Sequence, residues 1–209
     1  MNLSPKELYD RLRAEYGTPA WWSEDPYEVL VQAILVQKTG WENVKKTTAK
    51  MGALPEPATI AAMPAETLEA HIRPCGFAKG KARAILGVTE WYAGFGYDAA
   101  LVMERDTETL RKELLALRGI GAETADVMLV YAFRKPSFII DAYTRRLMER
   151  LGYGFRTDAE LRAFFEAGLP RDAAVYGTLH WLILDHGVAH CRKTPVCETC
   201  PLAAECAHA

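Results

Sequence analysis

The chain has 209 residues, of which half are hydrophobic and a quarter are charged, as in globular proteins with one or two compact domains. It contains no run of about 20 apolar residues, so no membrane-spanning helix is expected. The formal net charge of -2 excludes a generally basic surface. Residues 71–83 nevertheless carry four basic side chains and no acid, and residues 36–50 carry four against one. Such stripes can bind a polyanion, although charge runs are more often solvated faces.

The first predicted element is a helix in the N-terminal segment MNLSPKELYDRLRAEYG. Ser4 is the expected N-cap, Pro5 takes the first helical position, Glu7 completes a capping box and Gly17 ends the helix. The segment lacks the apolar core of a signal peptide, so we expect a cytoplasmic location.

Most of the remaining chain has the apolar spacing of helices. Further helices are predicted in residues 26–37, 107–118, 122–133, 157–168 and 170–190, the fourth opened by a second capping box of Thr157 and Glu160. One short β-like run covers residues 136–141 (PSFIID). Short loops rich in proline or glycine are expected around residues 52–57, 94–97 and 152–156. The sequence therefore predicts an all-α protein.

The stretch LRGIGAETA, residues 117–125, places the turn Gly119-Ile120-Gly121 between two helices. It predicts a helix–hairpin–helix motif over about residues 110–134. Glycine at both ends of the turn permits positive φ and leaves the approach to the backbone open. The N–H groups at the start of the second helix can then bind a phosphate without reading sequence. An ordinary tight turn between packed helices is the alternative.

Asp141 follows Gly121 by 20 residues and precedes the segment AYTRRLMERLG. Its residue type and position suit a helix N-cap. A carboxylate near an anion-binding turn could also act as a catalytic base or as the counter-charge to a cation.

Four cysteines lie near the C-terminus with the spacing C-x5-C-x2-C-x5-C, at Cys191, Cys197, Cys200 and Cys206. In a cytoplasmic chain this density indicates a metal site rather than disulfides. Zinc sites of four cysteines usually have two C-x2-C pairs, whereas this tail has one. The spacing favours an iron–sulfur cluster and leaves zinc open. The fifth cysteine, Cys75, is expected to be a buried thiol without a role.

The stretches LRGIGAETADVMLVYAF, IIDAYTRRL and VQAILVQKTGWENV, together with the cysteine tail, resemble the endonuclease III group of the helix–hairpin–helix DNA glycosylases. The resemblance extends from about Trp21 to the C-terminus. It implies two helical lobes that bind DNA across a cleft and flip out the target base. Residues 26–134 would form a six-helix lobe, and residues 1–25 with 135–209 a second lobe that ends in a cluster loop at 191–206.

The resemblance also implies roles for individual residues. It makes Asp141 the catalytic carboxylate, and it makes the tail a 4Fe–4S site rather than a zinc site. The candidates for DNA contact are Gln37 of the family's glutamine motif, the hairpin glycines Gly119 and Gly121, Lys79 and Lys81 of the basic stripe, and Arg192 and Lys193 of the cluster loop.

Two departures from the family pattern modify this prediction. Bifunctional members carry a nucleophilic lysine two residues after the second hairpin glycine, where this chain has Glu123. A carboxylate cannot form a Schiff base, so the sequence predicts a monofunctional glycosylase, with Lys38 as an amine that could supply residual lyase activity. Glu123 could equally be a favourable acid in the first turn of a helix. The first two cluster cysteines are separated by five residues rather than the usual six, which tightens the loop.

Three tryptophans bear on the substrate. Trp21 and Trp22 precede a proline, and Trp41 follows the glutamine motif, which resembles the 3-methyladenine glycosylase branch. Aromatic faces favour a cationic alkylated purine by about 0.5–2 kcal/mol, although tryptophans at such positions more often pack in the core.

The sequence thus predicts a monofunctional DNA N-glycosylase of base-excision repair that hydrolyses an alkylated purine such as 3-methyladenine. We expect a monomer in the cytoplasm, associated with the nucleoid, acting on double-stranded DNA with a damaged base. A glycosylase for oxidised or mismatched pyrimidines and an inactive DNA-binding module of the same fold are the alternatives.

Overall fold

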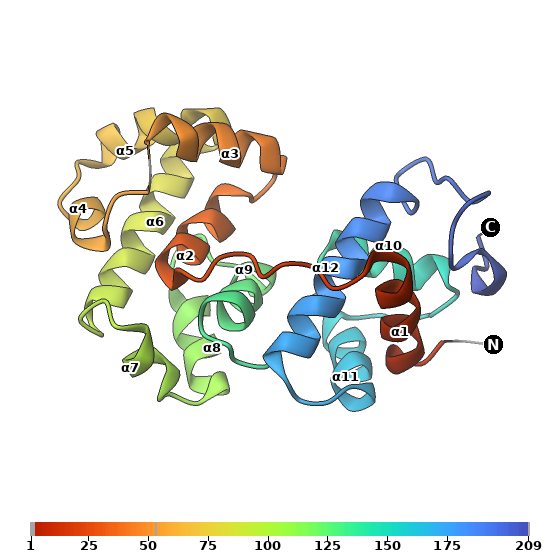
Figure 1. Ribbon diagram of the computed structural model, residues 1–209. Coiled ribbons are helices and arrows are strands. Elements are labelled where there is room, and N and C mark those ends of the chain that lie inside the picture. The colour runs from red at the N-terminus through yellow and green to blue at the C-terminus, as the bar shows by residue number, and fades with distance from the viewer. Residues whose placement is uncertain (1–2, 53, 209) are drawn as a thin grey trace. The chain divides into compact units, whose positions relative to one another are not determined.

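The computed structural model describes residues 3–52 and 54–208, and these form helices and no strands (Figure 1). The predicted all-α class is therefore confirmed. The two ends of the predicted second lobe (residues 1–2 and 209) and position 53 of the predicted loop 52–57 lie outside the described residues. The chain divides into two compact units. One runs from Trp22 to Lys135, and the other joins the residues up to Trp21 with those from Pro136 onward.

The unit of residues 22–135 is built around α2, in which every residue except Pro26 and Glu28 is buried. This helix packs against α6, α9 and the π-helical turn that follows α9. The helices of the unit are α2 (Pro26–Leu35), α3 (Trp41–Lys50), α4 (Pro57–Ala61), α5 (Ala65–Ile72), α6 (Ala78–Ala93), α7 (Ala99–Met103), α8 (Thr107–Ala116) and α9 (Ala122–Val127), with a 3-10 turn at Arg73–Cys75 and the π turn at Met128–Ala132.

The other unit joins sequence-distant segments, because α12 packs against both α1 and α10. Its core contains Phe138, Phe165 and Tyr176, and the two phenylalanine rings stack with centroids 4.1 Å apart. Its helices are α1 (Pro5–Tyr16), α10 (Ala142–Arg150), α11 (Asp158–Gly168) and α12 (Ala173–Ala189), followed by a 3-10 turn at Ala203–Glu205.

The predicted capping box at the N-terminus is confirmed. The Ser4 hydroxyl accepts from the backbone N–H of Glu7, and the Glu7 carboxylate accepts from the N–H of Ser4 at 2.8 Å. At α11 only half of the predicted box forms. Thr157 caps the N–H of Glu160, but the Glu160 carboxylate accepts from the N–H of Arg156 instead.

The sequence pattern of residues 136–141 is typical of a β-strand, but the segment does not form one. It is an extended connection with no strand partner in the described chain. Its apolar residues Phe138, Ile139 and Ile140 are buried by helices, and this burial accounts for the apolar run.

Candidate functional site

The hairpin joins α8 to α9, and its two glycines have different conformations. Gly119 has a φ of +90°, and a Cβ there would lie 3.0 Å from the Cβ of Ala84. Gly121 is the N-cap of α9 with a φ of -93°, so the expectation of positive φ at both glycines is wrong for Gly121. A Cβ at Gly121 would meet no atom within 4 Å, so the space in front of the helix N-terminus is open.

Gln37, from the turn after α2, is tied to this hairpin. Its Nε2 donates to the carbonyl of Gly119 at 3.1 Å and to the hydroxyl of Thr124 at 2.9 Å. The glutamine motif and the hairpin therefore form one continuous hydrogen-bonded surface within the unit. Insertion of Gln37 into DNA stays a prediction.

A pocket of about 260 Å³ lies beside the hairpin and is lined with basic groups. Phe77, which caps α6 with a left-handed φ of 50°, leaves 68% of its surface exposed there. The Nζ of Lys38 lies 5.7 Å from the centre of the Phe77 ring. The pocket's remaining lining includes Arg83, Arg118 and Gly119. Sequence reasoning missed Phe77, although an aromatic residue after a glycine inside a basic stripe was a usable signal.

Lys81 corrects one prediction. It was expected to contact DNA, but it is buried, and its Nζ donates to the carbonyls of Leu35 at 2.8 Å and Cys75 at 2.7 Å. Burial lowers the pKa of Lys81, and the nearby Cys75 raises it to a lesser extent. This lysine joins the end of α2 to the turn before α6, so it shapes the pocket floor rather than facing a phosphate. Lys79 is exposed, and its contact with DNA stays a prediction.

Two of the predicted pocket tryptophans lie together in the unit of residues 22–135. The rings of Trp22 and Trp41 meet edge to face with centroids 5.4 Å apart, and Trp22 also contacts Tyr131 at 5.5 Å. Trp41 is 38% exposed. Trp21 belongs to the other unit and is half-buried.

A series of side-chain hydrogen bonds runs from Trp22 into α2, and the sequence analysis did not predict it. The indole N–H of Trp22 donates to Gln32 at 2.6 Å, and the Gln32 amide donates to Glu28 at 2.8 Å. Gln32 is the one polar side chain among the buried residues of α2 that the structure describes, and a polar residue at a core position of an apolar pattern was the signal for it in the sequence.

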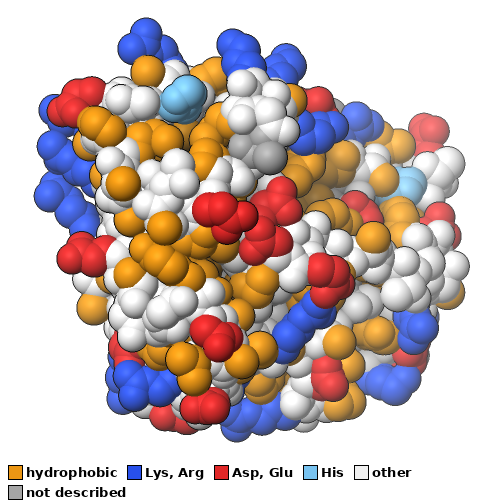
Figure 2. All heavy atoms as spheres, turned by 60° about the vertical axis from the view of Figure 1, so that its left-hand side comes forward, with side chains coloured by type: hydrophobic (Ala, Val, Ile, Leu, Met, Phe, Trp, Pro, Cys, Tyr) orange, Lys and Arg blue, Asp and Glu red, His pale blue; other side chains and the backbone are white. Residues whose placement is uncertain are grey.

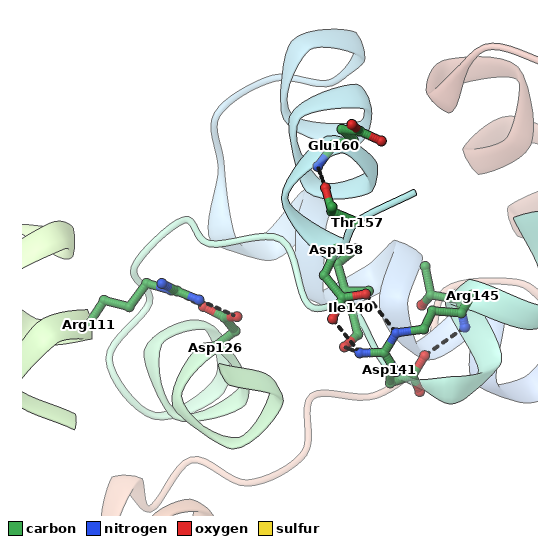
Figure 3. A network of polar contacts seen from close by, with 9 residues as sticks. Arg111, Asp126, Ile140, Asp141, Arg145, Thr157, Asp158 and Glu160 are labelled. Carbon is green, nitrogen blue, oxygen red and sulfur yellow. Dashed lines mark hydrogen bonds and ion pairs between the residues drawn. The ribbon is translucent and has the colours of Figure 1, made fainter. Parts of the chain in front are cut away.

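Asp141 is the N-cap of α10, as its position predicted (Figure 3). Its Oδ1 accepts from the backbone N–H of Thr144 at 2.7 Å, and its Oδ2 lies 3.6 Å from Nε2 of His180 on α12. The carboxylate is buried. Burial alone would raise the pKa of Asp141, but the hydrogen bond and charge of His180 and the bonds to Thr144 hold it below its usual value. The carboxylate is therefore ionised at neutral pH.

Glu123 lies in the first turn of α9 and is exposed. This is the place at which the resemblance put the catalytic lysine of other members. A carboxylate here favours the helix dipole and offers no amine.

The four tail cysteines line a single cavity. Cys191 accepts from Arg150 at 3.4 Å, and Cys200 lies 3.8 Å from Nε2 of His186, whose Nδ1 contacts the Tyr16 hydroxyl at 3.0 Å. In the described part of the chain, no three His, Cys, Asp or Glu side chains converge on a point where one metal ion could be held. Four thiols around a common cavity are of the ligand type that binds zinc or an iron–sulfur cluster, and the 4Fe–4S cluster stays a prediction.

The cluster loop presents its basic side chains to solvent. Arg150 donates to the carbonyls of Arg192 at 2.7 Å and Lys193 at 3.2 Å, so it holds the loop backbone while both side chains stay exposed. Cys75 is buried, as predicted.

The surface carries no single dominant charge on the face in view. Figure 2 shows acidic, basic and apolar side chains interspersed there, in keeping with the small net charge. None of the helices in residues 3–52 and 54–208 is both long and apolar enough to span a bilayer.

Comparisons with known proteins agree on one family. Residues 31–170 match the model of the HhH-GPD superfamily of base excision DNA repair proteins. A putative DNA repair glycosylase from Methanocaldococcus jannaschii is 38% identical over 96% of this chain and 94% of its own. Endonuclease III from Thermotoga maritima is 30% identical over 87% of this chain and 83% of its own.

Solved structures show the same fold. Helicobacter pylori 3-methyladenine DNA glycosylase bound to 1,N6-ethenoadenine has a TM-score of 0.76 at 25% identity, covering 88% of this chain and 96% of that one. An endonuclease III–DNA covalent intermediate has a TM-score of 0.81 at 24% identity, covering 99% and 97%.

Proposed function

The chain belongs to the HhH-GPD superfamily of base excision DNA repair proteins, and from this premise we propose that it is a monofunctional DNA N-glycosylase. The observation that carries the proposal is the buried, ionised carboxylate of Asp141 at the start of α10. As the glycosidic bond breaks, the sugar develops the charge of an oxocarbenium ion. A fixed anion stabilises that charge and orients the attacking water.

The absence of lyase activity is part of the proposal and rests on Glu123. A lyase needs an amine that attacks the sugar and forms a Schiff base. Glu123 lies where the resemblance places that amine. Lys38 is an exposed alternative amine, and its ammonium lies beside the Phe77 ring.

The proposed substrate is an alkylated purine. Trp22 and Trp41 supply aromatic surface, and Glu28 supplies a carboxylate behind it through Gln32. An electron-rich pocket of this kind favours a cationic base over the neutral bases of undamaged DNA. The likeness to a 3-methyladenine glycosylase supports the same choice.

A pyrimidine lesion is the second candidate, and the likeness to one relative favours it. A thymine/uracil-DNA glycosylase from Pyrobaculum aerophilum is 29% identical to this chain, over 86% of this chain and 78% of its own.

Duplex DNA is the proposed partner, bound by a monomer in the cytoplasm. The hairpin N–H groups in front of Gly121 would hold a phosphate, and the exposed ring of Phe77 would stack on a base. Lys79, Arg192 and Lys193 are exposed and would add contacts to the backbone.

The cysteine cavity is proposed to hold a 4Fe–4S cluster through Cys191, Cys197, Cys200 and Cys206. Such a cluster would cross-link the C-terminal loop and thereby order its basic side chains. Iron and acid-labile sulfide in the purified protein, lost on substitution of Cys197 by serine, would support it. Zinc in place of iron would contradict it.

The deciding experiment uses duplex DNA carrying radiolabelled methyl groups from a simple alkylating agent, in parallel with duplexes containing uracil or thymine opposite guanine. Released bases are identified by chromatography, and strand nicks are measured with and without alkali. We expect free 3-methyladenine, with nicks only after alkali. Release of uracil or thymine instead would favour the second candidate, and nicking without alkali would contradict monofunctionality.

Asp141→Asn is the matched control because it keeps the size and the capping oxygen of the side chain. An enzyme should lose turnover by about 100-fold or more while retaining DNA affinity. A wild-type protein that binds damaged duplex but releases no base would instead be an inactive binding module.

A further inference from the structure

The pairing of Asp141 with His180 has no part in the N-cap role of the aspartate. We propose that His180 is a positioning residue, which fixes the orientation of the Asp141 carboxylate through the polar contact of its Nε2 with Oδ2 at 3.6 Å. This inference rests on the proposed glycosylase function, because it assigns His180 a part in that reaction.

The packing of α12 on α10 brings the two side chains together. Gly187 and His180 lie seven residues apart on α12, which is two helical turns, so they share a face. A Cβ at Gly187 would lie 2.2 Å from the Cδ1 atom of Tyr143, so α12 lies very close to α10 there. Two turns earlier, the same face places His180 against Asp141, the residue that opens α10.

Burial makes the contact specific. The side chains of His180 and Asp141 are 8% and 7% exposed, so bulk water does not replace one partner freely when the other is removed. A buried carboxylate needs donors to stay ionised, and Thr144 supplies one to Oδ1. His180 lies beside the other oxygen, with its Nε2 3.6 Å from Oδ2, whereas Arg145 in the next turn is paired with Asp158 at 2.6 Å.

The two carboxylate oxygens of Asp141 have different partners, Thr144 at Oδ1 and His180 at Oδ2. The N–H of Thr144 holds Oδ1, as any N-cap would require. A contact at Oδ1 alone still permits the carboxylate to rotate. A second contact at Oδ2 restricts this rotation, and Oδ2 retains a lone pair for the attacking water or the developing cation.

The test compares two substitutions at position 180. Glutamine places an amide N–H close to the position of the imidazole Nε2, whereas leucine fills a similar volume without a donor. Single-turnover base release and DNA affinity are measured for both. We expect H180L to slow release by about 10- to 100-fold with affinity within about twofold, and H180Q to stay within about threefold of the wild type.

A second measurement does not depend on activity. Melting temperatures are determined for H180L, D141N and the double variant. If the side chains interact, the double variant should lose less than the sum of the single losses. Should H180L fail to fold, H180N takes its place, because its shorter amide does not reach Oδ2.

The outcomes separate this inference from the glycosylase proposal. Wild-type protein that releases no base would contradict the proposed function. The melting temperatures of the single and double variants would still show whether His180 and Asp141 interact. With an active wild type, equal rates for H180L and H180Q, or additive melting losses, would overturn the role of His180.

Discussion

Gly119 and Gly121 flank the same turn but are constrained in different ways, and this difference can be tested. Gly119 has a left-handed φ and a close neighbour in Ala84, whereas Gly121 is extended and faces open space. We expect Gly119→Ala to destabilise the fold by about 1–2 kcal/mol. Gly121→Ala should leave stability within about 0.5 kcal/mol but weaken DNA binding, because its methyl group would stand in front of the N–H groups.

Thermal unfolding and DNA titration of the two variants check this prediction together. Each variant serves as the control for the other. A G121A protein that binds DNA as tightly as the wild type would show that phosphate does not approach the hairpin there.

Glu123 offers a gain-of-function test. We expect Glu123→Lys to place an amine at the start of α9, where it can attack the sugar of a bound substrate. Borohydride should then trap a covalent protein–DNA complex that the wild type does not form. Glu123→Gln is the control, since it removes the same charge without supplying an amine. A trapped complex in the wild type would instead assign the amine to another residue, such as Lys38.

For individual residues, the sequence identified candidate site residues but not the burial or the partners of their side chains. Asp141 and the cysteines were found because a cap position and a spacing are visible along the chain. The burial of Lys81 was not, since its two carbonyl partners, at positions 35 and 75, come together only in the fold. Gln32 and His180 were missed for the same reason, because both matter through partners on other turns or helices.

At the scale of elements, the helices of the hairpin are held together by a buried ion pair. Arg111 on α8 donates to both carboxylate oxygens of Asp126 on α9, at 2.8 and 3.3 Å, and the Asp126 side chain is fully buried (Figure 3). Removing the arginine would leave a buried charge without this partner. Such losses cost about 3–5 kcal/mol in dry interiors, and about 2–3 kcal/mol is expected here because Arg111 is partly exposed.

Chemical denaturation of Arg111→Met measures this loss. The control is Arg105→Met, which removes an exposed pair with Glu113 that is worth about 0–1 kcal/mol. Equal losses in the two variants would show that the Arg111–Asp126 pair does not stabilise the hairpin. A loss confined to R111M, accompanied by weaker DNA binding, would link the pair to the geometry of the turn.

Helices were predictable as elements because apolar periodicity and capping residues are local signals. The exceptions have physical causes. The run Phe138–Ile140 is apolar because it is buried by helices, and a buried strand would show the same apolar pattern. The helix predicted to end at Arg118 ends at Ala116, since Leu117 must already be extended to enter the hairpin. The π turn at Met128–Ala132 has no signal in the sequence that we could identify.

At the scale of the whole molecule, the second unit depends on residues from both ends of the chain. Leu8 and Leu12 of α1 are buried in the same core as Leu179 and Ile183 of α12. The sequence alone gave no reason for this pairing. It came from the family resemblance, because nothing in the local pattern of an amphipathic helix identifies its partner.

The net charge of -2 means that the molecule as a whole exerts no general attraction on DNA, so affinity must come from local basic groups. Each phosphate contact releases counterions and steepens the fall of log affinity with log salt by about 0.9 units of slope.

We expect a steep salt dependence for the wild type. In Arg118→Gln the dependence should be less steep by about one unit of slope, because Arg118 lines the pocket beside the hairpin. Lys6→Gln, which removes a cation already paired with Asp10 at 2.5 Å on α1, should leave the slope unchanged. Binding that is insensitive to salt would contradict the proposed phosphate contacts. Equal slopes for all three proteins would show that Arg118 does not contact a phosphate.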